Sequence, residues 1–191
     1  MALKPERDVL KGQVFTIANF FSFLRILVVW PIVVQLQRNT PQSSLYALYL
    51  MLFGIATDFL DGFFARKFHQ RSDVGRVIDP LADKIAVAAV AYVLMQTRGM
   101  PVWFFALLIG RDLAILCLAP IMMKRIRAIP ESNWYGKIAV TVIALVFVLY
   151  TLNATPWNLW ALYLSLIFIG LSSWSYLVRF IRLLKETPLA E

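Results

Sequence analysis

Cysteine and histidine are almost absent from this sequence. Its 191 residues include one cysteine, Cys117, and one histidine, His69. A single cysteine can form no disulfide within the chain and no multi-thiolate metal site. No Ser–His or Cys–His arrangement that could support a covalent intermediate is present. These absences argue against a covalent intermediate on serine or cysteine, and they favour oxygen ligands over sulfur or imidazole ligands for any metal.

Charged residues are also scarce. They make up 16% of the chain, against 60% hydrophobic residues, and the mean hydropathy is +0.70. This balance excludes a soluble globular domain and predicts one compact membrane domain. Residues 1–13 are charged and lack the apolar core of a signal peptide. We expect an interfacial segment over 1–13, the membrane domain over 14–185 and a short tail over 186–191.

Apolar sequence is what the chain has in abundance. Six segments are each long enough to cross about 30 Å of hydrocarbon at roughly 1.5 Å per helical residue. Polar and charged side chains inside these segments favour a water-accessible cavity between helices. The sequence therefore predicts an all-α integral membrane protein with six transmembrane helices around a polar cavity open to the cytoplasm. The six predicted spans lie near residues 14–37, 43–66, 75–97, 101–123, 133–153 and 157–180.

The basic residues predict the orientation. The formal net charge is +8, but the positive side chains cluster at span ends rather than along one stripe, which argues against nucleic acid as a partner. The connections after the first, third and fifth spans carry only Arg38 and Arg98, and the other ends are rich in lysine and arginine. Positive residues favour the cytoplasmic side. Both termini and the connection after the second span are therefore expected in the cytoplasm, with anionic membrane lipids as partners.

Four carboxylates gather in one stretch of the otherwise apolar chain. Asp58 and Asp61 are spaced i, i+3, and Asp79 and Asp83 are spaced i, i+4, so each pair shares one face of a helix. A carboxylate at the bilayer centre costs about 2.5–3.5 kcal/mol, so a partner is expected. Carboxylate oxygens are the ligands of hard cations such as Mg²⁺ or Mn²⁺, which often also bind substrate phosphates. The stretch predicts metal-assisted phosphoryl transfer at a membrane surface.

Two other interpretations of these carboxylates stay open at this point. The helices could form a salt-bridged hairpin in which Arg66, Arg71 and Arg76 neutralise the acids. Intramembrane carboxylates also mark ion pathways, so a divalent-cation or proton transporter is an alternative from another class. The carboxylates bunch at one membrane face, whereas a transporter needs access from both sides.

Residues 58–83 resemble the signature of the CDP-alcohol phosphatidyltransferase family, D-x2-D-G-x2-A-R-x8-G-x3-D-x3-D. The fixed positions are all matched at the required spacing, by Asp58, Asp61, Gly62, Ala65, Arg66, Gly75, Asp79 and Asp83. The resemblance implies two divalent cations, Mg²⁺ or Mn²⁺, with Asp58, Asp61 and Asp79 as ligands. It also implies that Asp83 is the general base, a further metal ligand or both.

The same resemblance implies where a CDP-linked lipid binds. Small residues Gly62, Ala65 and Gly75 would let the cytidine approach the backbone, and Arg66 would reach the nucleotide phosphates. The first span carries an N-x2-S-x2-R pattern that resembles the first helix of phosphatidylglycerophosphate synthases and cardiolipin synthases of this family. Its members are Asn19, Ser22 and Arg25, which share one helical face and are expected to contribute to the CDP-lipid site.

Basic residues in later spans are the candidates for binding the alcohol acceptor. Arg111 and Lys137 are interpreted as buried bases without a partner, because the neighbours Arg111 and Asp112 should not face each other on a helix. The resemblance to phosphatidylglycerophosphate synthases implies that Arg111 and Lys137 hold the phosphate of an anionic acceptor. Lys84, next to Asp83, is a further candidate that could either contact phosphate or balance the carboxylates.

The function implied by the resemblance is transfer of a phosphatidyl group from CDP-diacylglycerol to an alcohol, with release of CMP. Glycerol 3-phosphate is the expected acceptor, with phosphatidylglycerol, the acceptor of cardiolipin synthases, as the alternative. The resemblance further implies a homodimer in a bacterial-type inner membrane.

Overall fold

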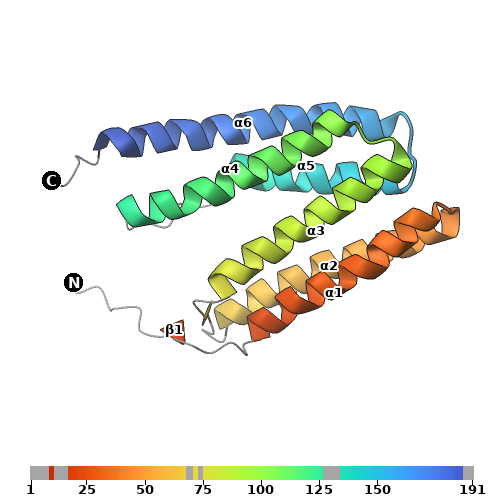
Figure 1. The fold of residues 1–191 in the computed structure, drawn as a ribbon, viewed down its shortest axis with the longest axis horizontal. Helices are drawn as coiled ribbons and strands as arrows, with labels where there is room; N and C mark the ends of the chain where they lie inside the picture. The colour runs from red at the N-terminus through yellow and green to blue at the C-terminus, as the bar shows by residue number, and fades with distance from the viewer. Residues whose placement is uncertain (1–8, 11–16, 68–70, 73–74, 127–133, 187–191) are drawn as a thin grey trace. The chain divides into compact units, whose positions relative to one another are not determined.

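The computed structural model describes residues 9–10, 17–67, 71–72, 75–126 and 134–186. Side chains are described within 23–57, 81–117 and 134–178, and for Ile181. The described chain is helical apart from one pair of two-residue strands, so the all-α prediction is confirmed (Figure 1). The helices are α1 (Ile17–Arg38), α2 (Pro41–Lys67), α3 (Gly75–Arg98), α4 (Val102–Ile126), α5 (Trp134–Thr151) and α6 (Trp157–Glu186).

The chain forms two units, Met1–Thr97 and Arg98–Glu191. In the first unit, α1 and α2 pack side by side as a helical hairpin (Figure 1). The strands β1 (Val9–Leu10) and β2 (Arg71–Ser72) pair in parallel, which joins the segment before α1 to the connection between α2 and α3. That pairing was not predicted from the sequence.

The turn between α1 and α2 is determined by local chemistry. Asn39 ends α1 in the left-handed region, with φ 53°, a conformation that asparagine tolerates better than most residues. Thr40 is the N-cap of α2, and Pro41 occupies the first helical position, where its missing N–H is not needed. The Ser43 N–H donates to Thr40 Oγ1 at 3.1 Å, and the Thr40 N–H donates to Ser43 Oγ at 2.9 Å. This reciprocal pair satisfies two backbone donors that the helix leaves open.

In the second unit, α5 and α6 pack against each other along most of α5 (Figure 1). The buried residues of α5 recur every three or four positions, as one helical face requires. They are Ala139, Ile143, Val146, Phe147, Tyr150 and Thr151. The facing residues of α6 include Leu162, Ser165, Ile169 and Ser172.

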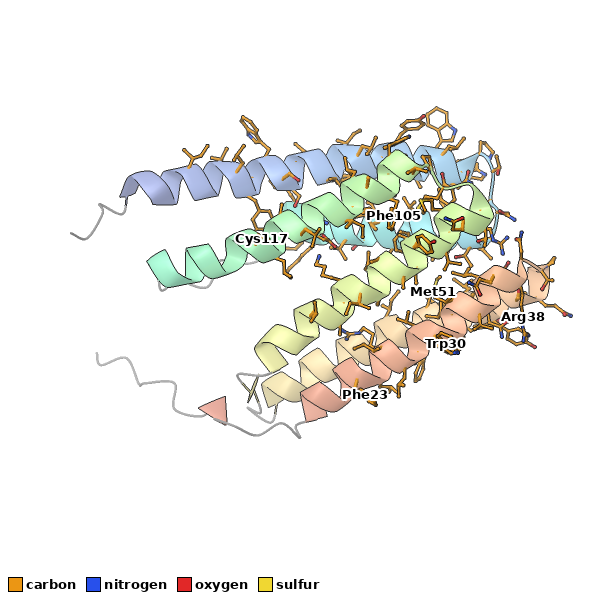
Figure 2. The ribbon with its side chains drawn as sticks, viewed as in Figure 1. Phe23, Trp30, Arg38, Met51, Phe105 and Cys117 are labelled. Atoms are coloured by element: carbon orange, nitrogen blue, oxygen red, sulfur yellow. The ribbon has the colours of Figure 1, made fainter. Side chains whose placement is uncertain are left out.

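Two helices among the described residues are long and apolar enough to cross a membrane: Trp134–Thr151 and Trp157–Val178. The outer surface carries many large apolar side chains, and Trp30 on α1 is 74% exposed. Figure 2 shows Phe23 and Trp30 along α1, both pointing away from the helix. Such side chains suit a lipid environment. Two of the six predicted spans thus meet the length and composition test, and six crossings remain a prediction.

Candidate active site

The carboxylate motif is divided between the end of one helix and the start of the next. Asp58 and Asp61 lie in the last part of α2, and Asp79 and Asp83 lie in the first part of α3. Helix α2 ends at Lys67 and α3 begins at Gly75, so the break expected between the two pairs is confirmed. Both helices belong to the first unit. The helical spacing places each pair on one side of its own helix.

Several predicted site residues have side chains outside the described part of the structure. The predicted metal ligands Asp58, Asp61 and Asp79 are among them, so most of the predicted metal site lies outside the described side chains. Within the described side chains, no three His, Cys, Asp or Glu residues come together. Most of the predicted CDP-lipid residues also lie outside the ranges whose side chains are described. They are Asn19, Ser22, Gly62, Ala65, Arg66 and Gly75.

Asp83 is the motif carboxylate whose side chain the structure describes. Arg25 Nη1 donates a hydrogen bond to Asp83 Oδ1, which also makes the two residues an ion pair. The contact joins α1 to α3 across 58 positions of sequence. The Arg25 side chain is 9% exposed and that of Asp83 is 47% exposed. The arginine that sequence analysis placed in the CDP-lipid site therefore contacts the predicted general base directly.

Arg25 is buried because it lies on the apolar face of α1. On α1, Arg25 lies seven and eleven positions before Ile32 and Leu36, and all three are buried. These spacings mark one face of a helix. Asp83 bears the same relation on α3 to Val90 and Leu94, which are also buried. The sequence therefore indicated that Arg25 and Asp83 lie on the apolar faces of their helices, because each continues an apolar stripe.

The proposed acceptor residues differ from their predicted environments. Arg111 Nη1 lies 3.5 Å from Asp112 Oδ1, with both side chains largely buried. The prediction that adjacent residues could not pair is wrong, because a long guanidinium side chain can reach around the helix although the two Cβ atoms diverge. Arg111 Nε is buried and has no hydrogen-bond partner among the described residues, so one donor of this arginine is not satisfied by the pair.

Lys137 is exposed rather than buried, which corrects a second expectation. Its Nζ lies 5.5 Å from the centroid of the Trp134 ring, within range of a cation–π contact. The preceding Gly136 faces α6: an added Cβ would lie 3.6 Å from Ser172 Oγ and 3.8 Å from Tyr176 OH. Lys84, the third acceptor candidate, is half-buried on α3 next to Asp83.

The chemistry of the motif fits a divalent cation. The motif offers carboxylate oxygens at helical positions on α2 and α3, and Mg²⁺ and Mn²⁺ prefer such oxygen donors. Asp83 brings a carboxylate that is about half exposed and therefore accessible.

Comparison with known proteins agrees with the motif. The family model for CDP-alcohol phosphatidyltransferase matches residues 15–171. The chain belongs to the CDP-alcohol phosphatidyltransferase family. The match runs from the segment before α1 into α6, so family membership rests on far more than the carboxylate motif.

Relatives within the family carry two kinds of name. A CDP-diacylglycerol–glycerol-3-phosphate 3-phosphatidyltransferase of Aquifex aeolicus is 33% identical over 131 residues, covering 68% of this chain and 71% of the relative. A protein of the same name from Pseudomonas fluorescens is 32% identical over 169 residues, covering 84% and 86%. A cardiolipin synthase (CMP-forming) of Streptomyces coelicolor is 29% identical over 152 residues, covering 78% and 70%.

Proposed function

We propose that this protein transfers the phosphatidyl group of CDP-diacylglycerol to glycerol 3-phosphate and releases CMP. The observation that carries the proposal is the complete carboxylate motif on α2 and α3 within a family match over residues 15–171. Relatives that bear the glycerol-3-phosphate name cover up to 84% of the chain, which supports this acceptor over others.

In the proposed reaction, the acceptor hydroxyl attacks the lipid-side phosphorus of the pyrophosphate. The new P–O bond forms as the bond from that phosphorus to the CMP oxygen breaks, and CMP leaves with the bonding electron pair. Asp83 accepts the hydroxyl proton as attack proceeds, which is the role of a general base. Its partial exposure leaves it accessible to an incoming hydroxyl.

The metal ligands of the proposal are Asp58, Asp61 and Asp79, with Asp83 as a further candidate. Two divalent cations, Mg²⁺ or Mn²⁺, would supply neutralisation of the charge on the pyrophosphate oxygens. The side chains of the chain itself bind the donor, orient it for in-line attack and take up the proton. Arg111 and Lys137 are proposed to bind the phosphate of the acceptor, because arginine and lysine donate charge-assisted hydrogen bonds to anions.

The setting of the reaction is part of the proposal. We place six membrane crossings over α1–α6, an interfacial segment over 1–13 and a tail over 186–191, in a cell inner membrane with the site and both termini cytoplasmic. Support comes from the clustering of basic residues at the predicted cytoplasmic ends. We also propose a homodimer, in keeping with the family resemblance.

The purified protein would be tested in mixed micelles with radiolabelled CDP-diacylglycerol and Mg²⁺ or Mn²⁺. Glycerol 3-phosphate, inositol phosphate and phosphatidylglycerol would be offered side by side, and CMP release measured for each. Glycerol 3-phosphate is expected to give the fastest release, and chelation of divalent cations should abolish it. Preference for phosphatidylglycerol would identify a cardiolipin synthase, which the Streptomyces relative makes the second candidate. Cation flux across vesicles without CMP release would favour a transporter.

A further inference from the structure

The contact between Arg25 and Asp83 is unequal in burial. The arginine side chain is 9% exposed, whereas the aspartate side chain is 47% exposed. Arg25 is packed on the face of α1 that also buries Ile32 and Leu36. Packing constrains a buried guanidinium more than a half-exposed carboxylate. The arginine is therefore the more tightly packed partner of the pair, and its contact helps to orient the aspartate.

A guanidinium group suits this task. It is planar, always charged and presents its N–H donors in a rigid fork, so a carboxylate that it binds is held in direction as well as in distance. Here Nη1 donates to Oδ1 of Asp83, which ties the position of this carboxylate oxygen to α1 as well as to α3. A general base must lie within hydrogen-bond reach of the proton it abstracts, so its orientation bears directly on the rate.

The same contact argues against a donor-binding role for Arg25. A side chain that binds the pyrophosphate of the donor has to direct its N–H groups at phosphate oxygens. Arg25 directs Nη1 at a carboxylate on α3 instead, and its side chain is almost completely enclosed by protein. Burial of a charge without a partner is strongly unfavourable, so the ion pair also explains how an arginine is accommodated on an apolar face of α1.

We propose that Arg25 is a positioning residue, which holds the Asp83 carboxylate in the orientation that proton transfer requires and does not bind the CDP-lipid. The inference rests on the proposed function for its kinetic consequence, but the ion pair itself can be tested without any activity. Removal of a side chain that orients a metal-binding or catalytic group usually lowers activity by about 10- to 100-fold.

The kinetic test compares Arg25→Gln, Arg25→Lys and the wild-type protein in steady-state CMP release. Arg25→Gln should lower kcat by about 10- to 100-fold, with the KM for CDP-diacylglycerol changed by no more than about twofold. Arg25→Lys keeps the positive charge without the planar fork and should recover part of kcat. Arg38→Gln is the matched control, because Arg38 is exposed at the other end of α1 (Figure 2), and it should behave as wild type. A raised KM for the donor with unchanged kcat would overturn the proposal and return Arg25 to the CDP-lipid site.

The structural test is a double-mutant cycle on thermal unfolding in detergent, with Arg25→Gln, Asp83→Asn and the double variant. The ion pair predicts that the loss in Tm caused by Arg25→Gln is clearly smaller when Asp83 is already neutral. Additive losses would overturn the pair and the inference with it, whatever the protein catalyses. Failure of the proposed function has a different signature, which is absence of CMP release by the wild-type protein with every acceptor.

Discussion

Asp83 is proposed as the general base and is also a candidate metal ligand. The neutral substitution Asp83→Asn tests its role as the base. Asp83→Asn preserves the shape of the side chain but cannot accept the hydroxyl proton. General base catalysis contributes about 10²- to 10⁴-fold, so kcat should fall by at least about 100-fold. Binding of CDP-diacylglycerol without acceptor, measured by equilibrium dialysis, should be largely retained. A rate close to that of wild type would show that Asp83 is not the base.

Arg111 and Lys137 are expected to affect the acceptor rather than the donor. Each charge-assisted hydrogen bond to an anion contributes about 1.5–3 kcal/mol, which corresponds to roughly 10- to 100-fold in affinity. Arg111→Ala and Lys137→Ala should therefore lower kcat/KM for glycerol 3-phosphate by that order, with the KM for CDP-diacylglycerol almost unchanged. Both would be measured by CMP release over a matrix of substrate concentrations.

The environments of these two bases refine that expectation. Arg111 pairs with Asp112 at 3.5 Å, so an acceptor phosphate has to share the guanidinium with a carboxylate. Lys137 lies over the Trp134 ring and is exposed, so its ammonium group is accessible. A larger loss for Lys137→Ala than for Arg111→Ala would follow from this difference. Activity with an uncharged alcohol alone would contradict a phosphate-binding role for both.

At the scale of elements, sequence and structure agree where the chain is long, apolar and bounded by turn residues. Asn39, Pro41 and Gly99 lie just outside or at the first residue of helices, and Gly99 has φ 66°, as expected for the residue that follows a helix. Helix identity and the break between Lys67 and Gly75 were therefore predictable from pattern. The break also separates the two carboxylate pairs, so the division of the motif between α2 and α3 was predictable.

What the sequence could not predict are side-chain contacts between or along helices. The Arg25–Asp83 pair depends on α1 and α3 meeting at one level, which requires the packing of two helices that are 58 positions apart at the contact. The Arg111–Asp112 contact depends on a rotamer that spacing alone does not specify. The pairing of Val9–Leu10 with Arg71–Ser72 is non-local and too short to leave a pattern. Helical periodicity indicates which face a residue occupies but not its partner.

The cap of α2 gives a stability prediction at the same scale. Thr40→Ala removes Oγ1, which accepts from the Ser43 N–H. The other bond of the reciprocal pair, from the Thr40 N–H to Ser43 Oγ, does not involve the threonine side chain. Loss of an N-cap costs about 1 kcal/mol, so the Tm of the purified protein in detergent should fall by a few degrees. Thr40→Ser keeps the hydroxyl and should retain nearly all of the stability. Equal losses for the alanine and serine variants would show that the hydroxyl is not what stabilises the turn.

At the scale of the whole molecule, the remaining expectation is the number and direction of membrane crossings. Among the described residues, two helices meet the length and composition of a span, and the distribution of lysine and arginine predicts the direction of all six. An even number of crossings places both termini on one side, and the carboxylate motif flanks a basic connection that should lie on that same side. The orientation therefore determines which compartment supplies the acceptor.

Cysteine labelling tests this topology once the native Cys117, which is exposed, is replaced by serine. Single cysteines would be introduced by Gln42→Cys in the first turn of α2 and by Thr155→Cys in the connection between α5 and α6. Two more would be introduced by Gln70→Cys and Ala128→Cys in the two basic connections. A membrane-impermeant maleimide added to intact cells should label positions 42 and 155, which are exposed in the structure. Positions 70 and 128 should react only after the membrane is permeabilised, because positively charged connections are retained in the cytoplasm.

Labelling of position 70 in intact cells would reverse the orientation, and it would place the carboxylate motif on the side of the membrane opposite to the proposed cytoplasmic site. Labelling of position 155 only after permeabilisation, with position 42 labelled in intact cells, would instead mean that an odd number of crossings separates the two connections.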